Sequence, residues 1–154
     1  MANLNSSGAN IGFQLASSLA PAFRANLSGT QTLTTTTFTK LAFATEVFDT
    51  NNNFDSTTNY RFTPTVAGYY HIQGGFYIAT AATILSSIYK NGSEYSRGVQ
   101  TASYGQSTYA AGLVYLNGST DYVELYGYHS LGSNNDVNSS TFLTYFNGFL
   151  ARSA

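Results

Sequence analysis

The sequence predicts a single all-β domain, folded as an antiparallel sandwich or jelly roll. Its 13 tyrosines and 11 phenylalanines, with many Thr, Val and Ile residues, are typical of strands. Short segments with alternating apolar and polar residues recur along the chain, and clusters of Asn, Asp, Gly and Ser separate them. No stretch has a convincing helical period. With 154 residues, 43% of them hydrophobic, the chain can bury one sizeable core.

The first half of the domain contains the stretch around which we expect the fold to be organised, residues 43–78. In order, the strands expected in this half are 22–27, 31–39 (an edge strand or an extended loop), 40–49, 60–66 and 70–78. Residues 49–59 are rich in Asn, Asp, Ser and Thr, whose side chains bond the nearby backbone and favour a turn. Ala67 and Gly68 form a tight corner. Gly74 and Gly75 inside the last strand indicate a β-bulge.

The second half continues the same pattern. Its expected strands are 84–90, 109–116, 121–129 and 142–151. Asn91-Gly92 after the first of these is a strong hairpin signal, because both residues tolerate positive φ. Asn117-Gly118 ends the next strand with the same chemistry, and residues 131–140 form a Gly-, Ser- and Asn-rich loop. The whole chain then has eight to ten short strands.

The low charge content favours self-association and gives no basis for a nucleic-acid partner. Charged residues make up 8% of the chain, against roughly 25% in an ordinary soluble domain, so few charges oppose self-association and we infer burial in an oligomer. The net charge is −1 and the six Lys and Arg residues are scattered, so no nucleic-acid partner is expected. The chain has no cysteine, which excludes disulfides. Neither a signal peptide nor a membrane-inserted segment is predicted.

Two parts are expected, an N-terminal arm at 1–20 and the β-domain at 21–154. The arm is rich in Asn, Ser, Gly and Ala, and its apolar anchors include Ile11, Phe13 and Leu15. It is either a mobile tail or an arm that becomes ordered on a partner or a neighbouring subunit. A purely solvated tail has little use for Phe13.

Residues suited to catalysis or metal binding are few. His71 and His129 are the only histidines, and a lone histidine does not supply the three or four ligands of a zinc site. Asp49 and Asp55 flank the polar turn, which suggests calcium, but the EF-hand pattern is absent and loop capping is the preferred interpretation. No nucleophile motif occurs. We therefore predict no catalytic, cofactor-binding or metal site and no enzymatic activity.

Three tyrosines lie on one face of the strand expected at 121–129. They are Tyr122, Tyr126 and Tyr128. Aromatic rings with a polar tip suit contacts with sugars and with protein partners. Two interpretations stay open, a sugar-stacking surface and a face that packs on a neighbouring loop or subunit.

The stretch 43–78 resembles the signature of the C1q/TNF-like jelly-roll family. The residues that match are Phe43, Asp49, Phe54, Phe62, Gly68 and Tyr70. The gap between Phe54 and Phe62 is one residue longer than usual, and Ile72 and Gly74 stand where the family has aromatic residues. Segments 88–92, 109–125 and 144–150 resemble the family's hairpin, penultimate strands and closing strand. The resemblance therefore covers about residues 22–151.

This resemblance implies a C1q/TNF-like jelly-roll β-sandwich of about ten strands that assembles as a compact homotrimer about a threefold axis. Carried onto this chain, it places Tyr109, Ala111 and Leu113 of one strand, and Phe146 of the last strand, near that axis. For all four residues, packing in the protomer's own core is the alternative.

The charge-poor surface, rich in Asn, Thr, Ser and Tyr, resembles C1q-like modules of tailed-phage virions, particularly phages of aquatic bacteria such as cyanophages. This implies a non-enzymatic viral structural protein, a capsid decoration (cement) protein on the virion surface. Its partners would be its own copies and the major capsid protein, bound through Ile11, Phe13 and Leu15. The alternative is the receptor-binding tip of a tail fibre or tailspike, which would recognise a host-surface glycan or protein through the tyrosines and the loops at 92–108 and 130–141. The lack of a shaft in this chain favours the first.

Overall fold

The computed structural model describes residues 20–80, 83–102 and 105–154, and within these ranges it contains strands and turns but no α-helix. The strands are β1 (Ala22–Asn26), β2 (Gln31–Leu33), β3 (Thr39–Lys40), β4 (Thr45–Asp49), β5 (Phe54–Asp55), β6 (Arg61–Phe62), β7 (Gly68–Ile78), β8 (Ile84–Lys90), β9 (Ser93–Arg97), β10 (Gln106–Leu116), β11 (Val123–His129), β12 (Asn135–Val137) and β13 (Tyr145–Ser153). The all-β prediction is confirmed. No helix in the described ranges could cross a membrane.

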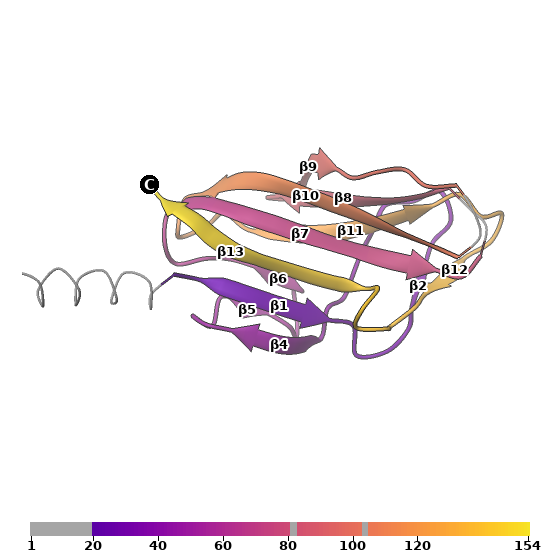
Figure 1. The fold of residues 1–154 in the computed structure, drawn as a ribbon, viewed down its shortest axis with the longest axis horizontal. Helices are drawn as coiled ribbons and strands as arrows, with labels where there is room; N and C mark the ends of the chain where they lie inside the picture. Colours follow the sequence, from indigo (N-terminus) through magenta and orange to yellow (C-terminus); the bar gives the residue numbers. More distant parts are fainter. Residues whose placement is uncertain (1–19, 81–82, 103–104) are drawn as a thin grey trace, which may run out of the picture.

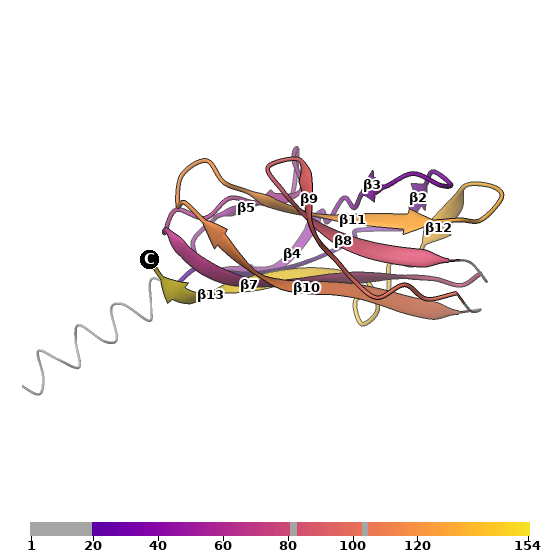
Figure 2. The same cartoon turned by 90° about the horizontal axis from the view of Figure 1, so that it is seen from above.

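Two antiparallel sheets pack face to face (Figures 1 and 2). The five-stranded sheet has the order β10-β7-β13-β1-β4. The six-stranded sheet has the order β5-β6-β11-β8-β9, with β3 also paired to β11, and a small β12-β2 pair lies beyond it. Strands β10 and β9 therefore border one side of the sandwich, and β4 and β5 border the other.

The stretch at 43–78 supplies about a third of the buried hydrophobic residues of the core between the sheets. In β7, Tyr70, Ile72, Phe76 and Ile78 are fully buried at every second position, which is the period of a strand with one face in the core. At the centre of the core the ring of Phe23 lies 4.4 Å from that of Phe62, centroid to centroid. Stacked and edge-on contacts of this kind add to the free energy of burial. Phe62 and Tyr70, which match the family signature, are thus core residues, whereas Phe48 and Tyr69 of the same stretch are exposed.

The predicted hairpin at Asn91-Gly92 is present. Lys90 of β8 pairs with Ser93 of β9, and φ is 51° at Asn91 and 79° at Gly92, as a two-residue turn between twisted strands requires. The hairpin fixes β9 beside β8 at the border of the six-stranded sheet.

The predicted bulge at Gly74 and Gly75 is wrong. Both pair in continuous register with β10 and with β13. The glycines are needed for close packing instead, because a Cβ atom would lie 2.6 Å from Leu125 Cδ2 at Gly74 and 2.4 Å from the Thr108 carbonyl oxygen at Gly75. Glycine in a strand can mark such a close approach as well as a bulge.

Several strand boundaries also differ from the prediction. The strand expected at 60–66 is only β6, and β12 lies inside the expected loop at 131–140. The last strand begins at Tyr145 rather than at 142, because the amides of Leu143 and Thr144 both donate to the Ser140 carbonyl and form a turn. Local turns of this kind are weakly marked in the sequence.

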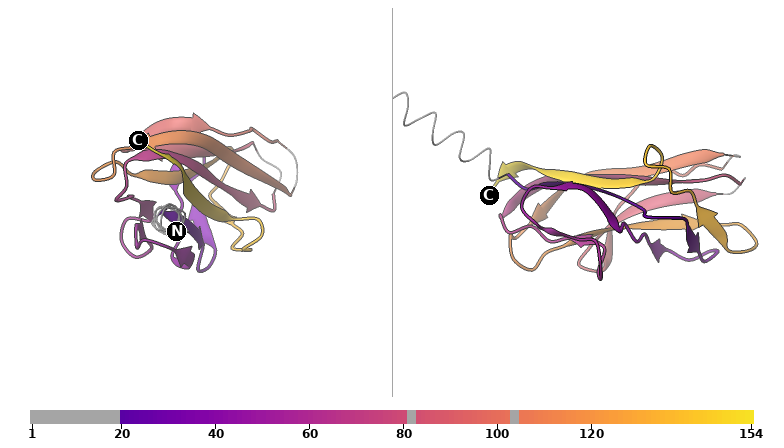
Figure 3. Two further views of the ribbon diagram at one scale, coloured as in Figure 1. Left: turned by 60° about the vertical axis from the view of Figure 1, so that its left-hand side comes forward. Right: turned by 90° about the horizontal axis from the view of Figure 1, so that it is seen from below.

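The described chain enters and leaves the sandwich at the same end. The beginning of β1 and the C-terminus lie together, whereas β2 and β12 lie at the opposite end with the loop at 130–134 (Figures 1 and 3). A segment that precedes β1 therefore starts from the end opposite to these loops.

Candidate self-association surface

The outward face of the five-stranded sheet carries large exposed apolar side chains. They are Tyr69 on β7, Tyr109, Leu113 and Tyr115 on β10, and Phe149 on β13, and we call them the apolar face. Leu113 is 57% exposed, Tyr109 56% and Phe149 51%. Leu113 and Phe149 lie on either side of His71, which is their register partner in β7. Large exposed apolar side chains that gather on one face are typical of interaction sites.

Three of the four residues predicted near a threefold axis lie on this face. Tyr109, Ala111 and Leu113 alternate along β10 with the buried Ala110 and Val114. Their side chains point away from the core and are free to contact another copy of the chain. Their place at an axis stays a prediction.

Phe146 does not lie on this face, so its predicted axial position is corrected. Its side chain is fully buried and its ring lies 5.0 Å from that of Phe23 and 5.6 Å from that of Phe43. Side chains alternate along β13, so Phe146 points into the core and Phe149 points outward. Phe149 is thus the aromatic residue of the last strand that belongs to the face, and sequence reasoning missed it.

The electrostatics of the apolar face do not oppose close contact. Strands β7, β10 and β13 contain no carboxylate and one cation, Arg152. The ring of His71 packs against that of Phe149 at 5.5 Å, and Tyr69 packs against Tyr115 at the same distance. Burial of this face against a second copy would therefore desolvate few charges.

The free edge of β10 is covered by polar groups of the other sheet. Carbonyl oxygens at four alternate positions of β10 accept hydrogen bonds. The Tyr109 carbonyl accepts from Val99 N and the Ala111 carbonyl from Ser96 Oγ. The Leu113 carbonyl accepts from Tyr95 Oη and the Tyr115 carbonyl from Lys90 Nζ. An edge covered in this way does not readily add a strand from another chain. A second copy would therefore pack on the face of the sheet rather than extend it.

The three tyrosines proposed for sugar stacking already have partners within the protomer. Tyr126 stacks on Tyr89 with 3.9 Å between ring centroids, Tyr128 lies 5.1 Å from Phe38, and the Arg61 guanidinium lies 4.2 Å from the centre of the Tyr122 ring. Burial raises the pKa of Tyr126 to about 12, and the charge of Glu124 acts in the same direction. Each of these rings therefore already packs against a side chain of its own protomer.

The acidic residues of the polar turn cap the backbone. Asp49 accepts hydrogen bonds from the amides of Phe54 and Asn51. Asp55 accepts from the amides of Thr57, Thr58 and Asn59 and from the side chains of Thr57 and Asn59. No group of three or more metal-ligating side chains occurs in the ranges that the structure describes. The geometry supports loop capping.

Asp55→Asn is expected to destabilise the protomer by about 1–2 kcal/mol at pH 7, because it removes the charge that these donors favour. The amides of Thr58 and Thr57 hold the pKa of Asp55 well below its usual range. A carboxyl with a lowered folded-state pKa stabilises the fold above its unfolded-state pKa of about 3.9 and loses this contribution as the pH falls toward the folded-state pKa. In urea unfolding, the difference in unfolding free energy between wild type and variant should be constant from neutral pH down to about 5. Below about pH 4 this difference should become smaller.

Asp136→Asn is the matched control, since Asp136 accepts a single side-chain hydrogen bond, from Thr32. This variant should lose less unfolding free energy than Asp55→Asn at every pH. An Asp55→Asn variant as stable as wild type at neutral pH would contradict the capping role.

Sequence reasoning missed the burial of two ionisable side chains, His129 and Glu124. His129 is fully buried, with Nε2 3.1 Å from the Leu33 carbonyl oxygen and Nδ1 accepting from the amide of Leu131. Glu124 is buried beside Lys40, with 3.0 Å between Oε1 and Nζ. Both ring nitrogens of His129 form hydrogen bonds with backbone groups, one in β2 and one in the loop after β11. We therefore assign this histidine a structural role.

The arm residues Ile11, Phe13 and Leu15 lie outside the described residues. Their binding role therefore stays a prediction, as does the division of the chain at residue 20.

No family model matches the sequence, and no significant match is found among curated proteins. Solved structures do match. The TNF protein Eiger from S. frugiperda aligns with a TM-score of 0.64 and 11% identity over 88% of this chain and 93% of its own. The globular domain of zebrafish complement 1qA aligns with a TM-score of 0.61 and 17% identity over 88% and 99%. The PRD1 vertex protein P5 aligns with a TM-score of 0.59 and 14% identity over 86% and 96%.

These similarities define the class of fold. The chain has the C1q/TNF-like jelly-roll fold, as the residues of the stretch at 43–78 led us to expect. The same fold occurs in the PRD1 vertex protein P5. At these identities the comparisons establish the fold alone.

Proposed function

We propose that this chain is a non-enzymatic structural protein of a virion surface, a trimeric capsid decoration protein. The observation that carries the proposal is the apolar face, which leaves Leu113, Tyr109 and Phe149 more than half exposed in a single protomer. Burial of such side chains against other copies is favourable at about 25 cal/mol per Å² of apolar surface.

The five-stranded sheet offers two unlike apolar patches, as a ring of copies requires. Side chains of β10 protrude at one border of the sheet. Toward the other border, Arg24, Phe48 and Phe149 line a recess of about 190 Å³. A head-to-tail interface joins unlike patches and forms a ring when its rotation closes, whereas a twofold dimer joins like patches. This arrangement supports a trimer.

The ends of the sandwich support an orientation on the virion. The arm at 1–20 precedes β1 at the end where β13 also finishes, and the loop at 130–134 lies at the opposite end (Figure 1). If the arm binds the major capsid protein, these loops point away from the shell. A trimer also matches the threefold positions of an icosahedral lattice, and binding across subunits would stabilise the shell by mass action.

Deletion of residues 1–20 is expected to abolish binding to the capsid and to leave the trimer intact. The reason is that Ile11, Phe13 and Leu15 are removed while the apolar face remains. Binding is measured by co-sedimentation with shells of the same virus that lack the protein, and the assembly state by light scattering.

Phe13→Ser in the full-length chain tests the same anchor without a deletion, and Phe142→Ser provides the control, since Phe142 is exposed but lies in a turn of the sandwich. Undiminished binding by the deletion variant would contradict the arm mechanism.

The second candidate is the receptor-binding tip of a tail fibre or tailspike. The observation that favours it is the row of aromatic rings outside the six-stranded sheet, where Tyr89 and Tyr126 stack. Antibody labelling of intact virions separates the two candidates. Label over the whole shell supports decoration, and label confined to the tail supports the tip.

A further inference from the structure

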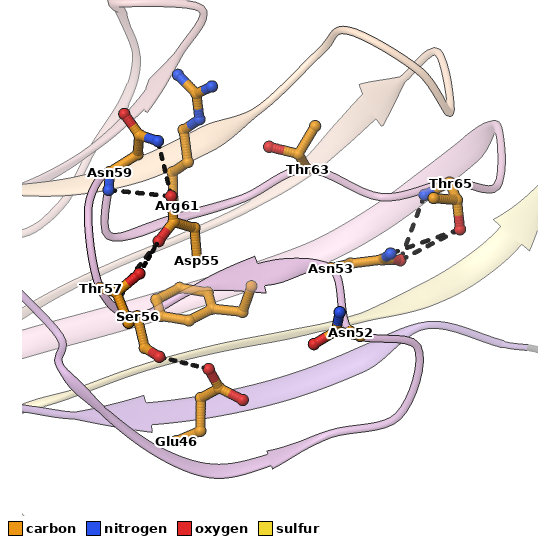
Figure 4. A pocket seen from close by; sticks show the side chains of 11 residues that line it. Glu46, Asn52, Asn53, Asp55, Ser56, Thr57, Asn59, Arg61, Thr63 and Thr65 are labelled. Carbon is orange, nitrogen blue, oxygen red and sulfur yellow. Dashed lines mark hydrogen bonds between the residues drawn. The ribbon is translucent and has the colours of Figure 1, made fainter.

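A polar pocket opens between the two sheets on the side of the sandwich away from β10. Its volume is about 460 Å³, within the range of small-molecule sites. Glu46 of β4 contributes to one wall, and Asp55, Arg61 and the loop after β6 contribute to the others. Figure 4 shows Glu46 and Ser56 on one side of the opening and Thr63 and Arg61 on the other.

A β-bulge directs Glu46 toward this pocket. Arg24 of β1 pairs with Phe48, but the next residue, Ala25, pairs with Glu46, so that Val47 is the extra residue in β4. Ala25 is fully buried, and its partner Glu46 therefore lies on the same face of the sheet, although it is exposed because β4 is the border strand. Without the extra residue, strict alternation would turn Glu46 to the outer face. Bulges that redirect a side chain are common beside functional sites.

The walls of the pocket are fixed before any ligand arrives. Asp55 is saturated by its five hydrogen bonds to the turn, and Asn53, only 7% exposed, bonds Thr65 through its side chain. Asn52, which lines the pocket, has a φ of 53°, which is uncommon for asparagine. Tyr60, which lies between the lining residues Asn59 and Arg61, has a φ of 51°, which is rare for a bulky residue. Strained backbone of this kind concentrates at binding sites.

Two polar groups of the pocket are left for a ligand. Among the described residues, Glu46 uses one carboxylate oxygen, to accept from Ser56, and the Thr63 hydroxyl has no hydrogen-bond partner. The Arg61 guanidinium lies over the ring of Tyr122 and is directed away from Glu46 (Figure 4), so Arg61 contributes to the wall and not to binding. The pocket therefore offers an acceptor at Glu46 and a hydroxyl that both donates and accepts at Thr63.

The charges exclude an anionic ligand. Glu46 and Asp55 are negative and Arg61 is the one cation among the lining residues, so phosphate or carboxylate would meet net repulsion. The polar walls are also unsuited to an apolar ligand. A neutral ligand with several hydroxyls can donate to Glu46 and form a further hydrogen bond with Thr63.

We propose that this pocket binds one neutral sugar residue of a glycan. This deepens the second candidate function, since it gives recognition of a host glycan a site and a ligand class. No exposed aromatic ring lines the pocket, so affinity for a single sugar is weak, with a dissociation constant of about 1–10 mM. Three pockets on one trimer would raise the overall affinity for a polyvalent glycan.

The test is an NMR titration of the isotopically labelled full chain with methyl glycosides of glucose, galactose and mannose, and with sodium glucuronate as the charged probe. The amide signals of Ser56, Thr57 and Thr63 should shift and saturate with at least one neutral glycoside. Glu46→Ala and Thr63→Val should each weaken this binding about fivefold, as expected for loss of one hydrogen bond. Thr37→Val, an exposed threonine outside the pocket, should leave it unchanged.

Light scattering on each variant shows whether it still assembles, so that a failure of sugar binding can be distinguished from a failure of the trimer. The pocket lies within one protomer, and a monomeric chain can therefore still be titrated. The proposal is contradicted if no neutral glycoside shifts these amides at about 100 mM. It is equally contradicted if Glu46→Ala and Thr63→Val bind as well as wild type, or if glucuronate binds more tightly than the glucoside.

Discussion

Leu113→Asp is expected to convert the proposed trimer into a folded monomer. Leu113 is 57% exposed in the protomer, so the single chain tolerates a charge there. In the assembled ring the same carboxylate would be buried, and Arg24 of the facing recess is already engaged by the Thr141 carbonyl oxygen and the ring of Tyr145. Burial of an unpaired charge should raise the dissociation constant of the trimer at least about 100-fold. Molar mass by light scattering and circular dichroism measure assembly and folding separately.

Phe142→Asp is the control for this variant. Phe142 is 87% exposed, but it lies in the turn before β13 and not on the apolar face. It should keep the wild-type mass. A Leu113→Asp protein that remains a trimer would show that the apolar face is not the interface.

Phe146→Ala should have the largest effect on the stability of the protomer. Phe146 is fully buried and contacts the rings of Phe23, Phe43 and Phe54. Replacement of a core phenylalanine by alanine leaves a cavity and costs about 3–5 kcal/mol. Chemical unfolding in the monomeric Leu113→Asp background measures this loss without a contribution from assembly.

Phe149→Ala, on the same strand and of the same residue type, is the matched control. Its side chain points outward, so it should cost the monomeric background under about 1 kcal/mol. In the wild-type background it should weaken the trimer. Equal losses of protomer stability for Phe146→Ala and Phe149→Ala would contradict their opposite placement.

The sequence predicted those parts of the fold that depend on local alternation and turn chemistry. In β7, Tyr70 and Ile72 repeat with the period of a half-buried strand, and Asn91-Gly92 defines its hairpin without reference to the rest of the chain. These signals depend on neighbouring residues only, which is why they could be recognised in one sequence.

The candidate sites depend on pairing between distant segments. Phe146 and Phe149 are both aromatic, and only the register of β13 with β7 shows that Phe149 faces outward. Likewise, Glu46 points into its pocket because Val47 forms a bulge opposite β1. The cover of the β10 edge by Tyr95 and Ser96 joins the two sheets and has no sequence pattern of its own.

The molar mass of the wild-type protein in solution tests the central claim most directly. Light scattering at micromolar concentration and physiological salt should give three times the 16.6 kDa of one chain. A stable species of 16.6 kDa across the concentration range would contradict the account, since the apolar face would then remain open to water and the trimeric decoration protein would lose its basis.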